Sequence, residues 1–593
     1  MTSPKLHSSF FALLLGGALS MAAISAGHAV ENEQAPSEKY IIVDSDSLLG
    51  SYLAGRIAQS VRDNEIAANY YGEALQKDPE STQILEEAFQ LKVLTGNFSE
   101  ALKLAKKLAS NSSDYKIASL FLGIDAFKSG KFDEAESHFI SAGNGPIVEL
   151  TARLARAWMA LEQGLPQHAL QIIDDVKSAQ TPGAEQIEQI NRALIADLGG
   201  MPKTAASIYE KLHEGNPGSV RLTTAYARHA AHQGNFKLAR KVLEPHLQDE
   251  TPNPLASEII AQLNSGVTPE LALTSAQDGM AEVFQSVGEA LGGDRVIDAG
   301  QIYLQLALFT KPDLPLAHYA LGELYDQAGN YQLAAETFGK LPKSSPFWLN
   351  AQLRRSYALS ALERHDEAKE VLKKLIEAYP DDMRPYYTMG NILRGNKEFA
   401  EGVGYYTQAI ERLGKEEASH WSVYYARGVC YERTEQWELA EKDLSKALKL
   451  DPDQELVMNY LGYSWVDQNL NLKEAMRLIE RAVEKKPRDG YFVDSLGWAY
   501  YRLNDFETAV KHLERAVELK PGDAVINDHL GDAYWKVGRR LEANYQWSHA
   551  LGLKPEPEDE AKIREKLEKG LVEDTTTRAA LEKNVDVPQR KSH

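Results

Sequence analysis

Two histidines and one cysteine have the types and spacing that could support metal or nucleophilic chemistry. His229 and His232 stand three residues apart on one predicted helix, so both imidazoles could reach one metal ion. No third ligand is apparent, so we interpret them as surface histidines and predict no metal site. Cys430 is the only cysteine, and it falls in a predicted helix where burial is favoured over the exposure that a nucleophile needs.

Other signatures of catalysis or cofactor binding are missing from the sequence. Gly288, Gly292 and Gly293 lie in a helical context without a preceding strand, which disfavours a phosphate-binding loop. The zinc-protease, serine-hydrolase and P-loop motifs do not occur. We therefore predict no catalytic residues and no cofactor, and a chain that is not an enzyme.

The charge balance is acidic. The 593 residues include 65 Lys and Arg against 85 Asp and Glu, a net charge of −20, which argues against nucleic acid as a partner. Most carboxylates, such as Asp366 and Glu367, stand at helix starts or on outer faces. An alternative from another class is a glycan-acting enzyme with an acidic groove, for which Asp494 or Asp528 would be essential.

The first 29 residues have the three-part layout of an export signal. Lys5 precedes an apolar run at 10–24, and small residues occupy the −3 and −1 places before a cut after Ala29. We predict a cleaved signal peptide at 1–29, a lead-in at 30–47 and a periplasmic mature chain. A buried or anchoring N-terminal helix is the alternative. We expect no transmembrane span in the mature chain, because no later run reaches about 18 apolar residues; peripheral outer-membrane association is left open.

A repeat with a period near 34 residues organises the rest of the chain. A column of small residues, mostly alanine, recurs at Ala67, Ala101, Ala135, Ala169, Ala205, Ala239, Ala299, Ala334, Ala368, Gly402, Ala440, Ala475, Ala509 and Ala543. Four places later the residue is almost always large and apolar, and twelve places earlier it is usually Gly, Ala or Ser. Apolar residues three, four and seven apart indicate two amphipathic helices per unit, joined by turns such as Gly234-Asn235.

The repeat predicts the architecture. One helical hairpin cannot bury its apolar face alone, whereas stacked hairpins can. We predict an all-α, right-handed superhelical solenoid of about fourteen hairpins. The predicted segments are an N-terminal array (48–252), an irregular break or hinge (253–279), a C-terminal array (280–557), capping helices (558–583) and a disordered tail (584–593).

The unit resembles a tetratricopeptide repeat. The strings YALGELYDQAGNYQLAAETFGKLPKSSP (319–346) and DSLGWAYYRLNDFETAVKHLERAVELKP (494–521) match that pattern throughout. Residues 454–550 are also similar to the C-terminal repeats of bacterial envelope proteins that include lipoprotein adaptors of a periplasmic carboxyl-terminal processing protease. The resemblance implies a periplasmic scaffold, although this chain lacks the cysteine that would carry a lipid.

In such a solenoid, places 2, 5, 9 and 12 of each first helix face an inner groove. Tyr and Trp offer large contact areas, and Asn can pair with a peptide backbone. The predicted protein-binding residues are Tyr387, Asn391, Arg394, Tyr425, Asn459, Tyr463, Asp494, Trp498, Tyr501, Asp528, Asp532 and Trp535. Packing between repeats is the alternative for each aromatic residue, and Asn391 with Arg394 resembles half of a clamp for a peptide carboxylate.

These observations favour a scaffold or adaptor that binds other envelope proteins or peptides in its concave groove. By resemblance, a periplasmic processing protease and its substrates are the candidate partners. The alternative within the same class is an accessory factor in outer-membrane assembly or polysaccharide export.

Overall fold

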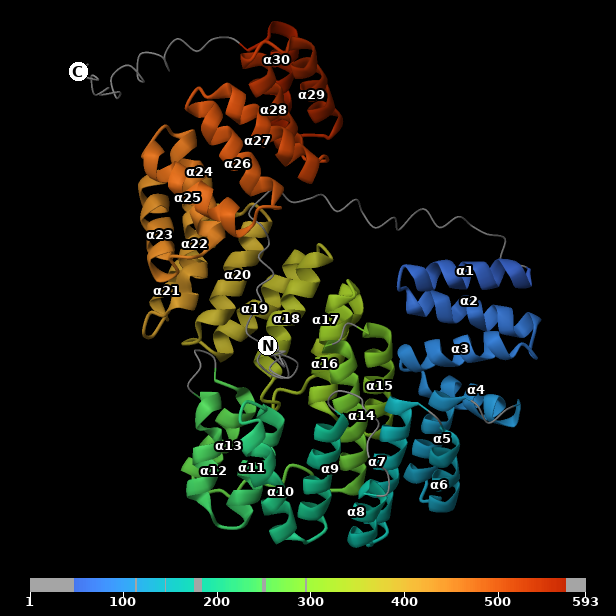
Figure 1. Ribbon diagram of the computed structural model, residues 1–593. Coiled ribbons are helices and arrows are strands. Elements are labelled where there is room, and N and C mark those ends of the chain that lie inside the picture. Colours follow the sequence, from blue (N-terminus) through green and yellow to red (C-terminus); the bar gives the residue numbers. More distant parts are fainter. Residues whose placement is uncertain are drawn as a thin grey trace, which may run out of the picture. The chain divides into compact units, whose positions relative to one another are not determined.

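The computed structural model describes residues 47–111, 115–143, 145–174, 184–247, 252–293 and 296–571 (Figure 1). The predicted signal peptide, the tail predicted to be disordered, almost all of the lead-in and the end of the predicted capping segment lie outside these ranges. The described residues form two compact units, one ending at Pro380 and the other beginning at Asp381. Throughout the described ranges the regular structure is helical, with fourteen hairpins and two single helices, α13 and α30.

The first unit holds nineteen α-helices and one short 3-10 helix in its described part. Their bounds are α1 (Leu48–Ser60), α2 (Asn64–Lys77), α3 (Thr82–Leu94), α4 (Phe98–Asn111), α5 (Lys116–Lys128), α6 (Phe132–Ser141), α7 (Pro146–Glu162), α8 (Pro166–Asp174), α9 (Ala184–Leu198), α10 (Pro202–Gly215), α11 (Val220–His232), α12 (Phe236–Leu243), η1 (Glu244–Leu247), α13 (Pro254–Asn264), α14 (Ala276–Gly293), α15 (Ile297–Thr310), α16 (Pro315–Gln327), α17 (Tyr331–Gly339), α18 (Trp348–Ala361) and α19 (His365–Ala378).

The second unit continues the same alternation of first and second helices. Its elements are α20 (Met383–Gly395), α21 (Phe399–Glu411), η2 (Ala418–His420), α22 (Trp421–Arg433), α23 (Trp437–Leu450), α24 (Glu455–Asp467), α25 (Leu472–Lys485), α26 (Gly490–Arg502), α27 (Phe506–Leu519), α28 (Ala524–Lys536), α29 (Arg540–Gly552) and α30 (Pro557–Lys569).

Local sequence sets where many of these helices begin and end. Ser219 caps α11 by accepting a hydrogen bond from the Leu222 amide, and Asp523 caps α28 in the same way through the amides of Val525 and Ile526. Five places before most members of the alanine column, the turn residue has a positive φ, as at Gly234. A positive φ suits glycine, which has no Cβ to clash, so the turn can reverse the chain within a few residues.

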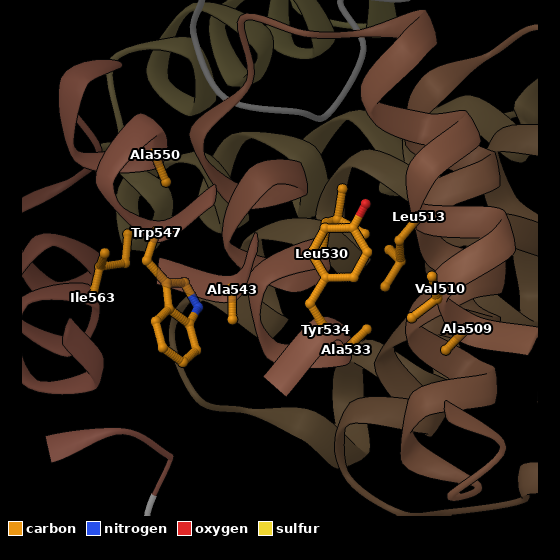
Figure 2. Packing of buried hydrophobic residues seen from close by; sticks show 10 residues of the cluster. All are labelled: Ala509, Val510, Leu513, Leu530, Ala533, Tyr534, Ala543, Trp547, Ala550 and Ile563. Atoms are coloured by element: carbon orange, nitrogen blue, oxygen red, sulfur yellow. The ribbon is translucent and has the colours of Figure 1, made fainter. Parts of the chain in front are cut away.

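The repeated small and large residues meet as the sequence predicts. The Trp547 ring fills the space beside Gly531, and a Cβ added at that glycine would lie 2.5 Å from the ring. Gly123 faces Phe139 in the same way in the first unit. Figure 2 shows the cluster at the end of the second unit, where Trp547, Tyr534 and their neighbours are buried. The predicted all-α solenoid of helical hairpins is confirmed.

A hairpin from the middle of the first unit covers the first helices of earlier hairpins. α14 packs against α7 and α9, and α15 packs against α3 and α5 (Figure 1). The buried Trp158 ring of α7 lies against Gly279 of α14, where a Cβ would come within 2.2 Å of the ring. Arg221 of α11 forms ion pairs of 2.8 Å with Glu282 and Glu289 of α14. Side chains that a free face would offer to a partner are therefore engaged within the unit.

This packing bears on the predicted break at 253–279. That stretch contains α13, and α14, which follows it, packs against α7 and α9, which precede it. The boundary between the two compact units falls between Pro380 and Asp381 instead. A hinge at 253–279 stays a prediction. In the repeated column of small residues, the assignment of Ala299 was wrong, because Ala299 is partly exposed. Gly300 is the small residue of this repeat, since Gly300 and Gly288 bring the backbones of α15 and α14 together.

No helix in the part of the chain that the structure describes is both long enough and apolar enough to cross a bilayer.

Candidate partner-binding face

The predicted binding residues lie on the first helices of the second unit, α20, α22, α24, α26 and α28. We call the side-chain positions at places 5, 9 and 12 of these helices the first-helix face. Four of the predicted residues on it are buried, namely Tyr387, Tyr425, Asp494 and Asp532. The other eight are partly exposed, namely Asn391, Arg394, Asn459, Tyr463, Trp498, Tyr501, Asp528 and Trp535.

The predicted half-clamp on α20 is engaged inside its own hairpin. The Tyr406 hydroxyl of α21 donates a hydrogen bond of 2.8 Å to Asn391 Oδ1, and Arg394 Nε donates one of 3.3 Å to the same hydroxyl oxygen. Burial raises the pKa of Tyr406 well above its ordinary value, so the phenol stays protonated. Both side chains therefore orient the buried Tyr406, and a peptide carboxylate would have to displace that contact.

Aromatic residues bridge the next two hairpins. Tyr425 of α22 packs edge-on against Tyr460 of α24, with ring centroids 5.7 Å apart. The Tyr460 hydroxyl donates a hydrogen bond of 2.9 Å to Glu432 on α22. Asn459 Oδ1 is buried and has no hydrogen-bond partner, while Tyr463, four residues later on the same helix, is partly exposed. This stretch thus keeps one unused acceptor and one accessible phenol ring.

A stack of three rings joins α26 to α28. Trp498 lies 4.1 Å from the His529 ring and 4.7 Å from the Tyr501 ring, with interplanar angles of 15° and 8°. Asp494 accepts from His529 Nδ1 at 3.0 Å. Burial alone would lower the pKa of His529, but the Asp494 carboxylate and the nearby Asp528 raise it. Asp494 and Trp498 of α26 therefore both contact His529 of the following repeat.

The last repeat is covered by α30. Lys566 of α30 donates to Asp528 at 2.7 Å and to Asp532 at 2.9 Å. Asp532 also accepts from Trp547 Nε1 at 2.9 Å. The Trp535 ring lies against the backbone of Gly570, directly after α30. α30 and the glycine after it, which belong to the same chain, therefore contact Asp528, Asp532 and Trp535.

Several of these partners were not among the predicted residues. Tyr460 and His529 stand at place 6 of their helices, one position away from the scored places, and each contacts the preceding repeat. A search for aromatic or titratable residues at place 6 could have found them. Lys566 lies in the predicted capping segment, and its charge among several others gave no signal for its contact with α28.

Two of the three candidates for chemistry outside this face, Cys430 and His229, are buried. Cys430 is fully buried, and burial raises the pKa of its thiol to about 12. His229 is also buried, against the surface position that we predicted, because its Nδ1 lies 2.7 Å from the Asp197 carboxylate. His232 is exposed. Over the described ranges, no group of three or more His, Cys, Asp or Glu side chains is arranged to hold a metal ion.

Comparison with known families confirms the nature of the repeat. Tetratricopeptide repeat models match residues 199–263, 316–347, 350–382 and 421–454, and a further TPR repeat model matches residues 497–538. These segments are therefore tetratricopeptide repeats, a class of helical hairpin suited to protein–protein interaction.

Individual relatives are similar over limited stretches. A TPR repeat-containing protein of Pseudomonas aeruginosa is 30% identical over 186 residues, 31% of each chain. A UDP-N-acetylglucosamine–peptide N-acetylglucosaminyltransferase of Giardia intestinalis is 30% identical over 119 residues, 19% of this chain and 8% of that enzyme. The chain thus spans less than a third of the length of these curated relatives.

Matches to solved structures extend over more of the chain. The Cut9–Hcn1 hetero-tetramer of APC/C is 14% identical and covers 89% of this chain and 97% of its own, with a TM-score of 0.39. Yeast Tom70 is 13% identical and covers 91% and 97%, with a TM-score of 0.30.

Proposed function

We propose that the protein is a periplasmic scaffold or adaptor that binds another envelope protein through the first-helix face of its second unit. The observation that carries the proposal is the contrast between the two units. In the first unit α14 and α15 cover the first helices α3, α5, α7 and α9, whereas Asn459, Tyr463 and Tyr501 in the second unit stay partly exposed. Partly exposed aromatic rings on a rigid helical frame offer large contact areas at small entropic cost.

Recognition rather than catalysis fits the polar groups of this face. Asp494 pairs with His529, and Asp528 and Asp532 both pair with Lys566. Carboxylates neutralised in this way are poor candidates for the acid and base of a glycan-acting enzyme, which need one free carboxylate each. The match to the Giardia transferase covers too little of that enzyme to favour catalysis here.

The proposed mechanism is an increase in effective concentration. A scaffold that holds two proteins at once lets them meet far more often than they would in free solution. The resemblance of residues 454–550 to envelope adaptors makes a carboxyl-terminal processing protease and its substrates the first partners to test. Outer-membrane assembly or polysaccharide export is the alternative pathway for the same scaffold.

A binding assay with the full-length chain tests the partner. We would immobilise the chain, pass a purified periplasmic processing protease over it, and compare wild type with the double variant Asn459→Ala, Tyr463→Ala. Tyr545→Ala is the matched control, because Tyr545 is 69% exposed on α29, a second helix. We expect the double variant alone to lose at least about tenfold in affinity. Equal binding by all three chains would place the contact elsewhere, and no binding by wild type would remove the adaptor role.

The exported location has its own test. Mass spectrometry of the chain purified from its host should find a mature N-terminus at Val30, in the periplasmic fraction. A chain that keeps residues 1–29 would contradict the proposal.

A further inference from the structure

α30 occupies the positions at which a partner would meet the last repeat. Asp528, Asp532 and Trp535 stand at places 5, 9 and 12 of α28, the places that bind partners in the proposed function. In the structure each of them contacts α30 or the glycine that follows it. An internal helix and an external partner could not use these side chains together.

The contact has a defined chemistry. Lys566 Nζ lies within 2.9 Å of both carboxylates, and all three side chains are largely shielded from water. Four residues later, Gly570 lies so close to Trp535 that a Cβ would come 2.1 Å from the ring. The surface formed by α28 therefore fits a cation and, four residues later in the chain that occupies it, a residue without a side chain.

The rest of α30 is attached mainly by apolar contacts, because the partly buried Leu567, and Leu571 just after the helix, pack against the cluster that contains Trp547. Within Pro557–Lys569 only Ile563 is buried, and it lies beside Trp547 in Figure 2. The other cations of the helix pair within it: Lys562 with Glu558, Arg564 with Glu560 and Lys569 with Glu565. Lys566 is thus the one cation of this helix that the structure pairs with another element, and such exposed pairs within a helix contribute little to its attachment.

We propose that α30 is a built-in occupant of the last repeat, and that the surface of Asp528, Asp532 and Trp535 accepts from a partner a helix with Lys or Arg four residues before a glycine. This inference rests on the proposed function, because it specifies what part of the first-helix face recognises. The short loop from α29 keeps α30 at a high effective concentration, so an incoming helix must compete with it. Displacing α30 would lengthen the available face by one repeat.

The test uses the full-length chain and no natural partner. Lys566→Gln removes the cation that bridges to α28, and Lys562→Gln is the matched control, since Lys562 pairs only with Glu558 and Asp559 of its own helix. Charge-assisted hydrogen bonds of this kind contribute enough that their loss should speed hydrogen exchange in α30 by roughly ten- to a hundredfold. Exchange in α20 to α25 should stay unchanged in both variants, which shows that the fold is intact.

A labelled peptide of residues 556–571 then probes the vacated surface. We expect it to bind the Lys566→Gln chain at least about tenfold more tightly than wild type or Lys562→Gln, because its own lysine restores the pair. A peptide with Lys566→Gln or Gly570→Leu should lose that advantage. The inference is overturned if α30 exchanges equally in both variants, if the peptide does not prefer the Lys566→Gln chain, or if the altered peptides bind as well as the parent. Because these readouts need no natural partner, their failure is separate from a failure of the proposed function.

Discussion

Replacing Gly279 by alanine tests the packing of α14 on the earlier repeats. The added Cβ would lie 2.2–2.3 Å from three ring atoms of Trp158. That ring is fully buried and its Nε1 donates to Asn191 Oδ1 at 2.8 Å, so it has little room to move. Overpacking of a core costs about 1–3 kcal/mol, while a glycine-to-alanine change in a helix gains about 1 kcal/mol. Because the clash involves three atoms of a fully buried ring, the cost lies at the upper end of that range, about 3 kcal/mol, and we expect a net loss of about 2 kcal/mol in the stability of the first unit.

Hydrogen exchange of the amides in α7 and α14 is the appropriate assay. A chain of two compact units does not unfold in one step, so a single melting temperature would mix their contributions. A loss of about 2 kcal/mol corresponds to roughly thirtyfold faster exchange in these helices. Gly293→Ala is the control on the same helix, because nothing lies within 4 Å of a Cβ at that position. Unchanged exchange in Gly279→Ala, or an equal loss in Gly293→Ala, would refute the account of this contact.

Three further predictions concern the rest of the chain. Cys430, whose buried thiol has its pKa raised to about 12, should resist a thiol reagent in the native protein at pH 8 and react only after denaturation; rapid native labelling would contradict its burial. Glu435 has a φ of 59°, so Glu435→Gly should stabilise its hairpin by up to about 1 kcal/mol, measured by hydrogen exchange in α22 and α23, and more than Asn504→Gly stabilises α26 and α27, since asparagine tolerates that conformation better; an equal or opposite effect would show that the turn is not strained. The pKa of His529 is raised, so its contribution to stability is complete below its unfolded pKa near 6.5 and is lost as the pH rises through the folded value. Burial raises the pKa of Asp532 to about 6, which likewise favours the folded state at lower pH, and Asp494, Asp528 and Lys566 are the other charged groups facing this cluster. Exchange in α26 and α28 should therefore be better protected at pH 6 than at pH 8.5 after correction for intrinsic rates, and His529→Gln should reduce the difference; a variant with the full wild-type slope would show that another group is responsible.

The hairpins could be predicted because their contacts are local in sequence. The small residue of a first helix and the large residue of the second helix belong to one hairpin with a short turn, so the same separation in sequence recurs in nearly every repeat. Gly531 with Trp547 and Gly123 with Phe139 show how a missing side chain on one helix makes room for a ring on the other. Such a spacing is visible to anyone who aligns the chain with itself.

The packing of α14 and α15 could not be predicted in this way. Arg221 meets Glu282 and Glu289 across more than sixty residues of sequence, and the column at Ala299 was displaced by one because Gly300 makes the close approach. Periodicity identifies which face of a helix is apolar, but it does not say which distant segment covers that face. The prediction of the groove considered each first helix by itself. It therefore did not include His529 and Tyr460, which contact the preceding repeat.

Site-specific photo-crosslinking tests the central claim most directly. A benzophenone amino acid would replace Tyr463, on the first-helix face, or Tyr545, the exposed residue of α29, in the full-length chain in its host cell. The account predicts one crosslinked envelope protein from position 463, with its contact segment identified by mass spectrometry, and none from position 545. Capture from position 545 alone, or from neither position, would contradict the claim that the second unit binds its partner through this face.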